Sequence, residues 1–264
     1  MDEQKEKLCN ALLSLLNIME RLRAPDGCPW DAQQTEQTLK VYLLEEAYEV
    51  VDAIEKEDPE ALCEELGDLL FQIVFLTQLA KEKRRFTFLD VLERIRDKMI
   101  RRHPHVFGNK KVRDAQEVAD NWAKIKRQEK KQDPEKVLDS VPSSLPALLR
   151  AHRLSERAAK FGFDWEGKEQ VWEKVKEEFL ELKTAIDKQD STKVKEEIGD
   201  LIFSLVNLSR HWGFNAEDIL RDANSKFMDR FSKMMLSLRE KGIDIEKASI
   251  EQMDQIWEEI KKDA

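Results

Sequence analysis

The segment from Glu64 to Leu79, EELGDLLFQIVFLTQL, is apolar over most of its circumference when it is placed on a helix. At about 100° per residue one polar window is left, which the side chains of Glu65, Asp68 and Gln72 share. Because burying an unpaired charge is costly, each acid must face a cation, share a proton or line a wet pocket. The pattern predicts a mostly buried helix with acids at its start.

The preceding segment, LLEEAYEVVDAI at 43–54, has one apolar stripe, with Glu46 at its border and Glu49 nearly opposite. Taken alone, it is typical of an amphipathic helix with a solvated acidic face. Asp58 and Pro59, between the two segments, predict a tight turn with proline at the first helical position. We therefore expect an antiparallel hairpin in which the acids of the two helices face one another.

The hairpin pattern occurs twice. EELGDLLF at 64–71 matches EEIGDLIF at 196–203, and LLEEAYEVVDAI matches VKEEFLELKTAI at 175–186, both at an offset of 132 residues. The recurring acids are Glu45, Glu46, Glu49, Glu65 and Asp68 in the first half, and Glu177, Glu178, Glu181, Glu197 and Asp200 in the second. Weaker echoes relate Lys98, Arg102, Trp122 and Lys126 to Lys226, Arg230, Trp257 and Lys261. A repeat of this length indicates a duplicated domain.

The first half predicts five helices, near residues 3–23, 35–56, 58–83, 88–102 and 114–131. Only 8 Gly and 7 Pro, with abundant Glu, Lys, Leu and Ala, favour helices over strands. We predict an all-α fold of two tandem duplicated domains with four-helix-bundle-like cores. The predicted boundaries are 1–132 for the first domain, 133–146 for a proline-containing linker and 147–264 for the second domain. Because one half of four or five helices cannot bury all of its apolar surface alone, we expect a homodimer in which helix hairpins meet in four-helix arrangements.

Composition narrows the choice of partners. The net charge of -9 over 264 residues argues against nucleic acid as the main partner. An uncharged stretch of membrane-spanning length and a signal-peptide pattern are both missing from the sequence, so we expect no membrane association. Three cysteines without C-x-x-C spacing indicate a reducing compartment, and a cytoplasmic location is expected.

The paired acids point to a metal site. Glu46 and Glu49, like Glu65 and Asp68, are three residues apart, so each pair presents oxygens from one helix face. Four converging carboxylates repel unless a hard cation neutralises them, and Mg²⁺ is the default, with Mn²⁺ as an alternative. The intact duplication of the pattern favours this reading over solvated acids.

These residues resemble the MazG-type all-α nucleoside triphosphate pyrophosphohydrolases, whose signature is E-E-x-x-E, a spacer and E-x-x-D. Here the signature occurs as EEAYE with ELGD and as EEFLE with EIGD. GCPWD, RRHPHVFG, SLPALLRAHR and GFDW extend the resemblance over essentially the whole chain, as in two-domain members. The resemblance implies Mg²⁺-dependent hydrolysis of nucleoside triphosphates to monophosphate and pyrophosphate, and a role in clearing abnormal nucleotides.

Residue roles follow from the resemblance by position. The implied metal ligands of the second half are Glu178, Glu181, Glu197 and Asp200. Lys226 and Arg230 are implied phosphate contacts, and Trp257 and Lys261 contacts to base and phosphate. Stacking on Trp257 would tolerate any base. Outside the resemblance, this tryptophan is more typical of a core, and the Lys226–Arg230 pair of a solvated helix face.

The two halves differ in the cations beside their acids. Lys174 lies four residues before Glu178 and Lys193 four before Glu197, whereas Tyr42 and Ala61 occupy the first-half positions. Because a triphosphate needs cations, we expect the second half to be the main catalytic domain, with Glu177 as an orienting group or base. Lys98, Arg102, Trp122 and Lys126 could bind nucleotide in the first half, or do nothing there.

Two rival functions stay open. One is a narrower pyrophosphohydrolase for a deoxyuridine or phosphoribosyl nucleotide. The other is a helical scaffold that senses nucleotides or binds proteins and whose acids hold structural metal. His103 and His105 are interpreted as loop or packing residues, because Pro104 separates them and no cysteine ligand lies near them in sequence. The sequence has no G-x-x-x-x-G-K motif, which excludes a P-loop enzyme.

Overall fold

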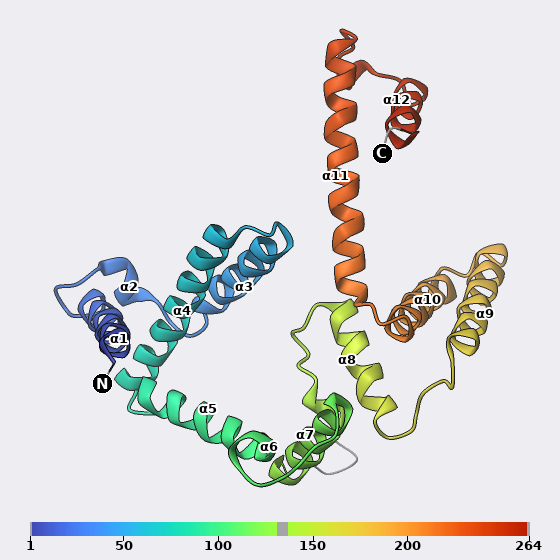
Figure 1. Ribbon diagram of the computed structural model, residues 1–264. Helices are drawn as coiled ribbons and strands as arrows, with labels where there is room; N and C mark the ends of the chain where they lie inside the picture. The colour runs from blue at the N-terminus through green and yellow to red at the C-terminus, as the bar shows by residue number, and fades with distance from the viewer. Residues whose placement is uncertain (1, 131–136, 263–264) are drawn as a thin grey trace. The chain divides into compact units, whose positions relative to one another are not determined.

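The computed structural model describes residues 2–130 and 137–262, except for several side chains between 116 and 130 (Figure 1). Every regular element within these ranges is helical, which confirms the all-α prediction. No described helix combines the length and apolarity needed to cross a membrane. Residues 133–136 of the predicted linker and the side chain of Lys126 lie outside the described residues. The contacts divide the chain into two units, Met1–Lys130 and Lys131–Ala264.

Unit 1 contains the five predicted helices and two short ones. Its helices are α1 (Glu3–Leu22), α2 (Pro29–Gln33), α3 (Leu39–Glu55), α4 (Pro59–Glu82), α5 (Phe88–Arg102), α6 (Pro104–Phe107) and α7 (Ala115–Lys130). The largest difference from prediction is the start of α3, expected near residue 35. Thr35 and Thr38 bond each other's backbone N–H through their hydroxyls, at 2.9 and 3.2 Å, and this turn delays the helix.

Unit 2 repeats the hairpin and adds a long helix. Its elements are η2 (Leu138–Ser140), α8 (Ala147–Ala159), α9 (Lys168–Asp187), α10 (Ser191–His211), α11 (Ala216–Glu240), η3 (Ile245–Lys247) and α12 (Ile250–Lys262). In Figure 1, the first turns of α11 lie next to the end of α10, and the rest of α11 extends away from the α9–α10 hairpin. Helix α12 packs beside the C-terminal part of α11. We call residues 216–262 of α11, η3 and α12 the arm.

The two hairpin turns are built alike. The side chain of Asp58 caps α4 by accepting from two backbone N–H groups, at 3.0 and 3.1 Å. Asp190 caps α10 in the same way, with both bonds at 3.1 Å. The residues before the caps, Glu57 and Gln189, both have left-handed backbone, with φ of 52° and 55°. Because this conformation is uncommon for residues other than glycine, its recurrence shows that the duplication extends to backbone geometry.

Each hairpin is buried only in part. In unit 1, Met19 of α1 packs on the second half of α4 around Val74, Phe75 and Leu79. In contrast, the first half of α4 is open to solvent: Leu66 is 49% exposed. The exposed apolar residues of the two hairpins include Val41, Leu44, Tyr48, Leu66, Leu70, Ile73, Phe179, Leu180, Ile198, Ile202, Phe203 and Leu205. The predicted burial of these helices is therefore incomplete in the isolated chain.

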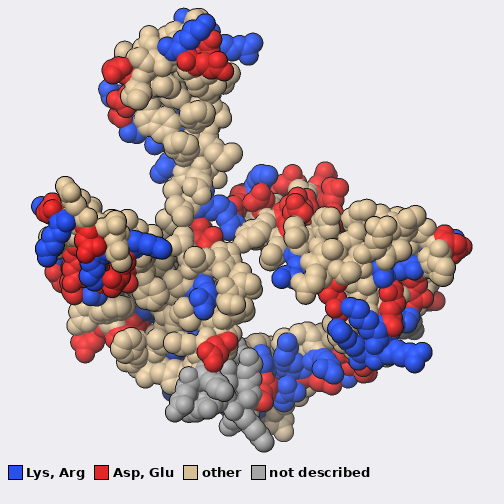
Figure 2. All heavy atoms as spheres, turned by 180° about the vertical axis from the view of Figure 1, so that it is seen from behind, with Lys and Arg blue, Asp and Glu red and all other residues tan. Residues whose placement is uncertain are grey.

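The arm has its own small core and an open surface. Met234 and Leu238 of α11 pack on Ile256 of α12, with Trp257 at the edge of this cluster. The exposed apolar side chains of α11 are Ile219, Leu220, Phe227, Met228, Phe231 and Leu236. On the face seen in Figure 2, the column that carries α11 is mostly uncharged. Such a surface is typical of a helix that packs against another chain.

An ion pair fixes the loop before α9 to the end of α10. Arg210 donates to both carboxylate oxygens of Asp164, one at 2.9 Å, and the Nε2 of His211 lies 3.0 Å from the same carboxylate. These contacts, chiefly the Arg210 bonds, lower the pKa of Asp164 from 3.8 to about 2. The loop therefore depends on the ionised carboxylate.

We expect Asp164→Asn to lower the free energy of unfolding by about 2 kcal/mol at pH 7. A depressed carboxyl pKa stabilises the fold above the unfolded-state value, and this contribution disappears as pH falls from about 4 to about 2. The gap between variant and wild type should therefore narrow over that interval in urea unfolding. Asp187→Asn, at an exposed position at the end of α9, is the control. A gap that does not change with pH would contradict the assignment.

Candidate active site

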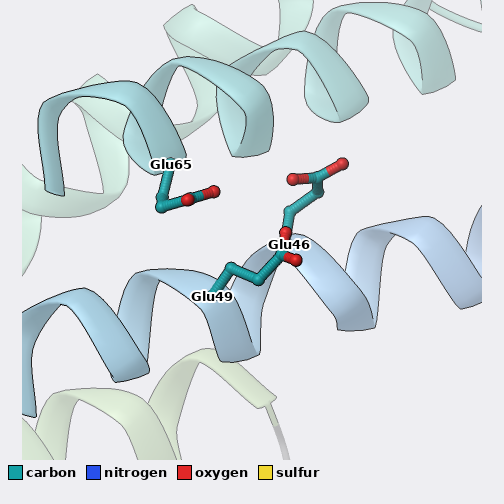
Figure 3. Close-up of side chains that lie close together, drawn as sticks. All are labelled: Glu46, Glu49 and Glu65. Carbon is teal, nitrogen blue, oxygen red and sulfur yellow. The ribbon is translucent and has the colours of Figure 1, made fainter. Parts of the chain in front are cut away.

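Three carboxylates of unit 1 meet between α3 and α4 (Figure 3). Glu46 and Glu49 lie one turn apart on α3, and Glu65 reaches toward them from α4. One oxygen of each lies within 4.8 Å of the others. The three-residue spacing on α3 puts both of its acids on the side that faces α4, as the sequence predicts.

Among the described residues, no lysine forms an ion pair with Glu46, Glu49 or Glu65, although the charge of Lys56 acts weakly on Glu65. Burial raises the pKa of Glu46, with the charges of Asp68 and Glu49 acting in the same direction, while a hydrogen bond from Gln72 at 3.2 Å opposes the rise. Partial burial also raises the pKa of Glu65, and the neighbouring charges of Glu49 and Asp68 add to it. Protons therefore bind Glu46 and Glu65 more readily than ordinary carboxylates, and a cation would relieve the same repulsion.

The acids of unit 2 form the equivalent cluster between α9 and α10. Glu178 and Glu197 are buried, at 6% and 5% exposure, whereas Glu181 is exposed. Oxygens of the three again lie within 4.8 Å of one another. The duplicated sequence pattern thus produces a duplicated arrangement of carboxylates.

Lysines neutralise the two buried acids of unit 2. The Nζ of Lys174 lies 2.7 Å from Glu178 and 2.8 Å from Glu177, and these bonds raise the pKa of the lysine. The Nζ of Lys193 lies 3.1 Å from Glu197. The four-residue spacing puts each lysine on the same helix face as its acid, as expected from the sequence. Two ammonium groups are thus already paired with the buried acids of this cluster.

The fourth acid of each set lies apart from the other three. Asp68 is near enough to influence the pKa of Glu46 and Glu65, but it is outside the 4.8 Å group. Asp200 is exposed, one turn after Glu197 on α10. The expectation that four carboxylates converge in each half therefore holds for three of them in this chain, and the roles of Asp68 and Asp200 stay predictions.

The second-half nucleotide contacts predicted beyond α10 gather on the arm. Trp257 lies against Phe227, with ring centroids 5.4 Å apart. Lys261 is bonded to Glu258 at 2.5 Å and lowers the pKa of that carboxyl, and the charge of Arg230 adds a smaller effect. Lys226 is exposed on α11. The predicted site residues of unit 2 thus fall into two groups. The acids lie on the α9–α10 hairpin, and Lys226, Arg230, Trp257 and Lys261 lie on the arm.

Two of the corresponding residues of unit 1, Arg102 and Trp122, contact each other. Arg102 pairs with Glu129 at 2.6 Å and lies over the ring of Trp122, with its Cζ 5.3 Å from the centroid. Arg102 and Arg101 hold the pKa of Glu129 at about 2. Lys98 is partly exposed, and the side chain of Lys126 is outside the described residues. Arg102 is therefore engaged within the protein, which weakens the case for a phosphate contact here.

His103 packs as interpreted from the sequence. Its Nδ1 lies 2.7 Å from the carbonyl oxygen of Met99, and its ring meets Trp122 with centroids 4.9 Å apart. His105 contacts the same histidine ring, at a centroid distance of 5.6 Å. Pro104, between them, starts the short helix α6 instead of the expected loop.

Sequence reasoning missed two residues of these groups. Phe227 packs against the ring of Trp257. Its position next to Lys226 in a long amphipathic helix was the sequence signal that could have identified it. Gln72 was placed in the polar window but not recognised as a donor to Glu46. Its buried Oε1 has no hydrogen-bond partner among the described residues.

The donor sets fit a hard divalent cation. Each cluster offers carboxylate oxygens at separations that one ion can bridge, and no sulfur or imidazole ligand belongs to either group as described. Oxygen-only ligands of this kind suit Mg²⁺ or Mn²⁺. The residues that would hold it are Glu178, Glu181 and Glu197 in unit 2 and Glu46, Glu49 and Glu65 in unit 1.

Known proteins share these features along the chain. The family model of the MazG nucleotide pyrophosphohydrolase domain matches residues 34–107 and 166–235. A nucleoside triphosphate pyrophosphohydrolase of Escherichia coli K12 is 44% identical over 259 residues, covering 96% of this chain and 98% of its own. The nucleoside triphosphate pyrophosphohydrolase/pyrophosphatase MazG of Thermotoga maritima is 43% identical over 247 residues, covering 94% of each chain.

Among solved structures, a mazG-related protein from Thermotoga maritima aligns with 43% of this chain and 97% of its own, with 28% identity and a TM-score of 0.38. The two matched ranges of the family model each contain one acidic cluster and together span more than half of the chain. The resemblance found in the motifs is confirmed: the chain belongs to the MazG family of nucleotide pyrophosphohydrolases and carries two MazG domains in tandem.

Proposed function

We propose that unit 2 hydrolyses nucleoside triphosphates to a monophosphate and pyrophosphate with Mg²⁺, and accepts many bases. The observation that carries this proposal is the group of Glu178, Glu181 and Glu197 with Lys174 and Lys193 on the two buried acids. Two relatives that align over nearly their full length are named for this substrate class. Clearing abnormal nucleotides would be the cellular use of such broad tolerance.

When bound, Mg²⁺ would neutralise phosphate charge and make a bound water more nucleophilic. The water oxygen bonds to the α-phosphorus, the bond from that phosphorus to the bridging oxygen breaks, and pyrophosphate leaves. We assign the water proton to a carboxylate, with Glu177 as the candidate, since it is exposed beside Glu178. Lys174 and Lys193 are placed to exchange their carboxylate partners for phosphate oxygens as substrate enters.

Lys226, Arg230 and Lys261 are proposed to hold the remaining phosphate charge, and Trp257 to stack on the base. In Figure 1 the arm that carries them extends away from the hairpin of the same chain. We therefore propose a homodimer in which the arm of one chain covers the acidic cluster of the other. The exposed apolar side chains of the hairpins and of α11 supply surface for such packing.

The test is pyrophosphate release over a panel of canonical, damaged and deoxyuridine triphosphates and phosphoribosyl nucleotides, with Mg²⁺, Mn²⁺ or EDTA. We expect turnover of many triphosphates with Mg²⁺, substitution by Mn²⁺, and none with EDTA. Turnover of one nucleotide alone would favour the narrower pyrophosphohydrolase. Nucleotide binding without turnover would overturn the catalytic proposal and favour the scaffold.

A further inference from the structure

The acidic cluster of unit 1 contains a buried amide side chain, where the repeat in unit 2 has a buried serine. Gln72 of α4 is 8% exposed, and its Nε2 donates to Glu46 at 3.2 Å, so its amide lies at the cluster. The Oε1 of the same amide is buried and has no hydrogen-bond partner among the described residues. A buried amide oxygen without a partner has lost its hydrogen bonds to water, and coordination to a bound cation would compensate for that loss.

The equivalent position of unit 2 is different. Ser204 lies 132 residues after Gln72, and its hydroxyl donates to the carbonyl oxygen of Leu201 at 2.9 Å. Its short side chain is satisfied by its own helix and offers nothing to Glu178 or Glu197. Gln72 is therefore a specific addition to unit 1, one turn beyond Asp68 on the cluster-facing side of α4.

The two clusters also differ in their counter-charges. In unit 2, Lys174 and Lys193 occupy the carboxylates of Glu178 and Glu197. A divalent ion entering that cluster must displace an ammonium group, which costs less when a triphosphate is there to accept the lysines. Tyr42 and Ala61 occupy the lysine positions in unit 1. Among the described residues no ion pair holds Glu46, Glu49 or Glu65, and the charge of Lys56 has only the smallest effect on the pKa of Glu65, so a cation has no bonded ammonium to displace there.

We propose that unit 1 binds one divalent cation without nucleotide, held by Glu46, Glu49 and Glu65 together with the amide oxygen of Gln72. Unit 2, in contrast, takes up its cation only together with a triphosphate. The ion of unit 1 would join α3 to α4 and stiffen their hairpin, a structural role separate from turnover. Three carboxylates and one amide oxygen form a ligand set that Mg²⁺, Mn²⁺ and Ca²⁺ all accept.

The test is titration of the full-length, nucleotide-free protein with Mn²⁺, with free Mn²⁺ followed by electron paramagnetic resonance. We expect one ion per chain in the wild type, and a second only when a non-hydrolysable triphosphate analogue is added. Gln72→Ser introduces the residue found at the equivalent position of unit 2, and it should weaken the affinity for the first Mn²⁺ ion by about 10-fold. Glu46→Gln should remove it, and Glu178→Gln should leave it unchanged.

Thermal unfolding supplies a second measurement. Mn²⁺ should raise the melting temperature of wild type and Glu178→Gln, but not of Glu46→Gln. Loss of the nucleotide-free ion in Glu178→Gln, or its retention in Glu46→Gln, would overturn the proposal, as would wild type that binds no Mn²⁺. An unchanged affinity in Gln72→Ser would exclude the amide as a ligand. None of these results depends on turnover, so failure of the catalytic proposal is separately visible.

Discussion

Glu178→Gln is expected to lower the rate of pyrophosphate release by at least about 100-fold, the scale of removing one charge-stabilising group from an active site. The carboxylate of Glu178 is buried beside two other acids and is paired with Lys174. An amide at this position removes one negative charge from the proposed metal site and leaves Lys174 without its ion pair to residue 178. The measurement is kcat and KM for a well-accepted triphosphate at saturating Mg²⁺.

Glu46→Gln, the same change at the repeated position, is the matched control and should stay within about 3-fold of wild type. Unit 1 lacks the lysines that would meet a triphosphate, and its Arg102 is engaged by Glu129. Equal losses in the two variants would refute the asymmetry between the halves. A large loss in Glu46→Gln alone would move catalysis to unit 1.

Pairing two inactive chains should restore activity. Glu178→Gln damages the hairpin, and Arg230→Ala damages the arm, each losing about 100-fold alone. In a heterodimer of the two, one site contains the intact hairpin of one chain and the intact arm of the other. Chains co-expressed with different tags and purified through both should therefore regain about half of wild-type activity, because one of the two sites of a symmetric dimer is whole.

The control is the heterodimer of Glu178→Gln with Glu197→Gln. Both lesions lie in the hairpin, so neither of its two sites is intact and activity stays low. If Glu178→Gln with Arg230→Ala also stays low, the arm serves the hairpin of its own chain. If Arg230→Ala alone keeps full activity, the role carried over from the family is wrong for this residue.

The helices and the acidic pairs could be predicted from sequence because local patterns determine them. The segment 64–79 is apolar except for one polar face, so its acids had to lie on that face. The Asp-Pro turn then predicted that this helix packs antiparallel against the helix that contains Glu46 and Glu49. The lysines four residues before Glu178 and Glu197 were predictable for the same reason, since a helix places such residues together.

What could not be predicted depends on contacts between distant segments. Nothing local indicates that Arg102 is captured by Glu129, which lies 27 residues farther along. The unpartnered oxygen of Gln72 appears only when α3 and α4 are packed. The exposure of Leu66 and its neighbours could not be predicted either, because periodicity shows that a residue is apolar but not which surface packs on it.

The ion pairs of Lys174 and Lys193 have a consequence for conditions of magnesium scarcity. Because the protein's own ammonium groups balance the buried acids of unit 2, that hairpin can hold its shape while no metal is bound. Depletion would then stop the proposed hydrolysis without unfolding the hairpin of unit 2, and resupply of the metal would restore it.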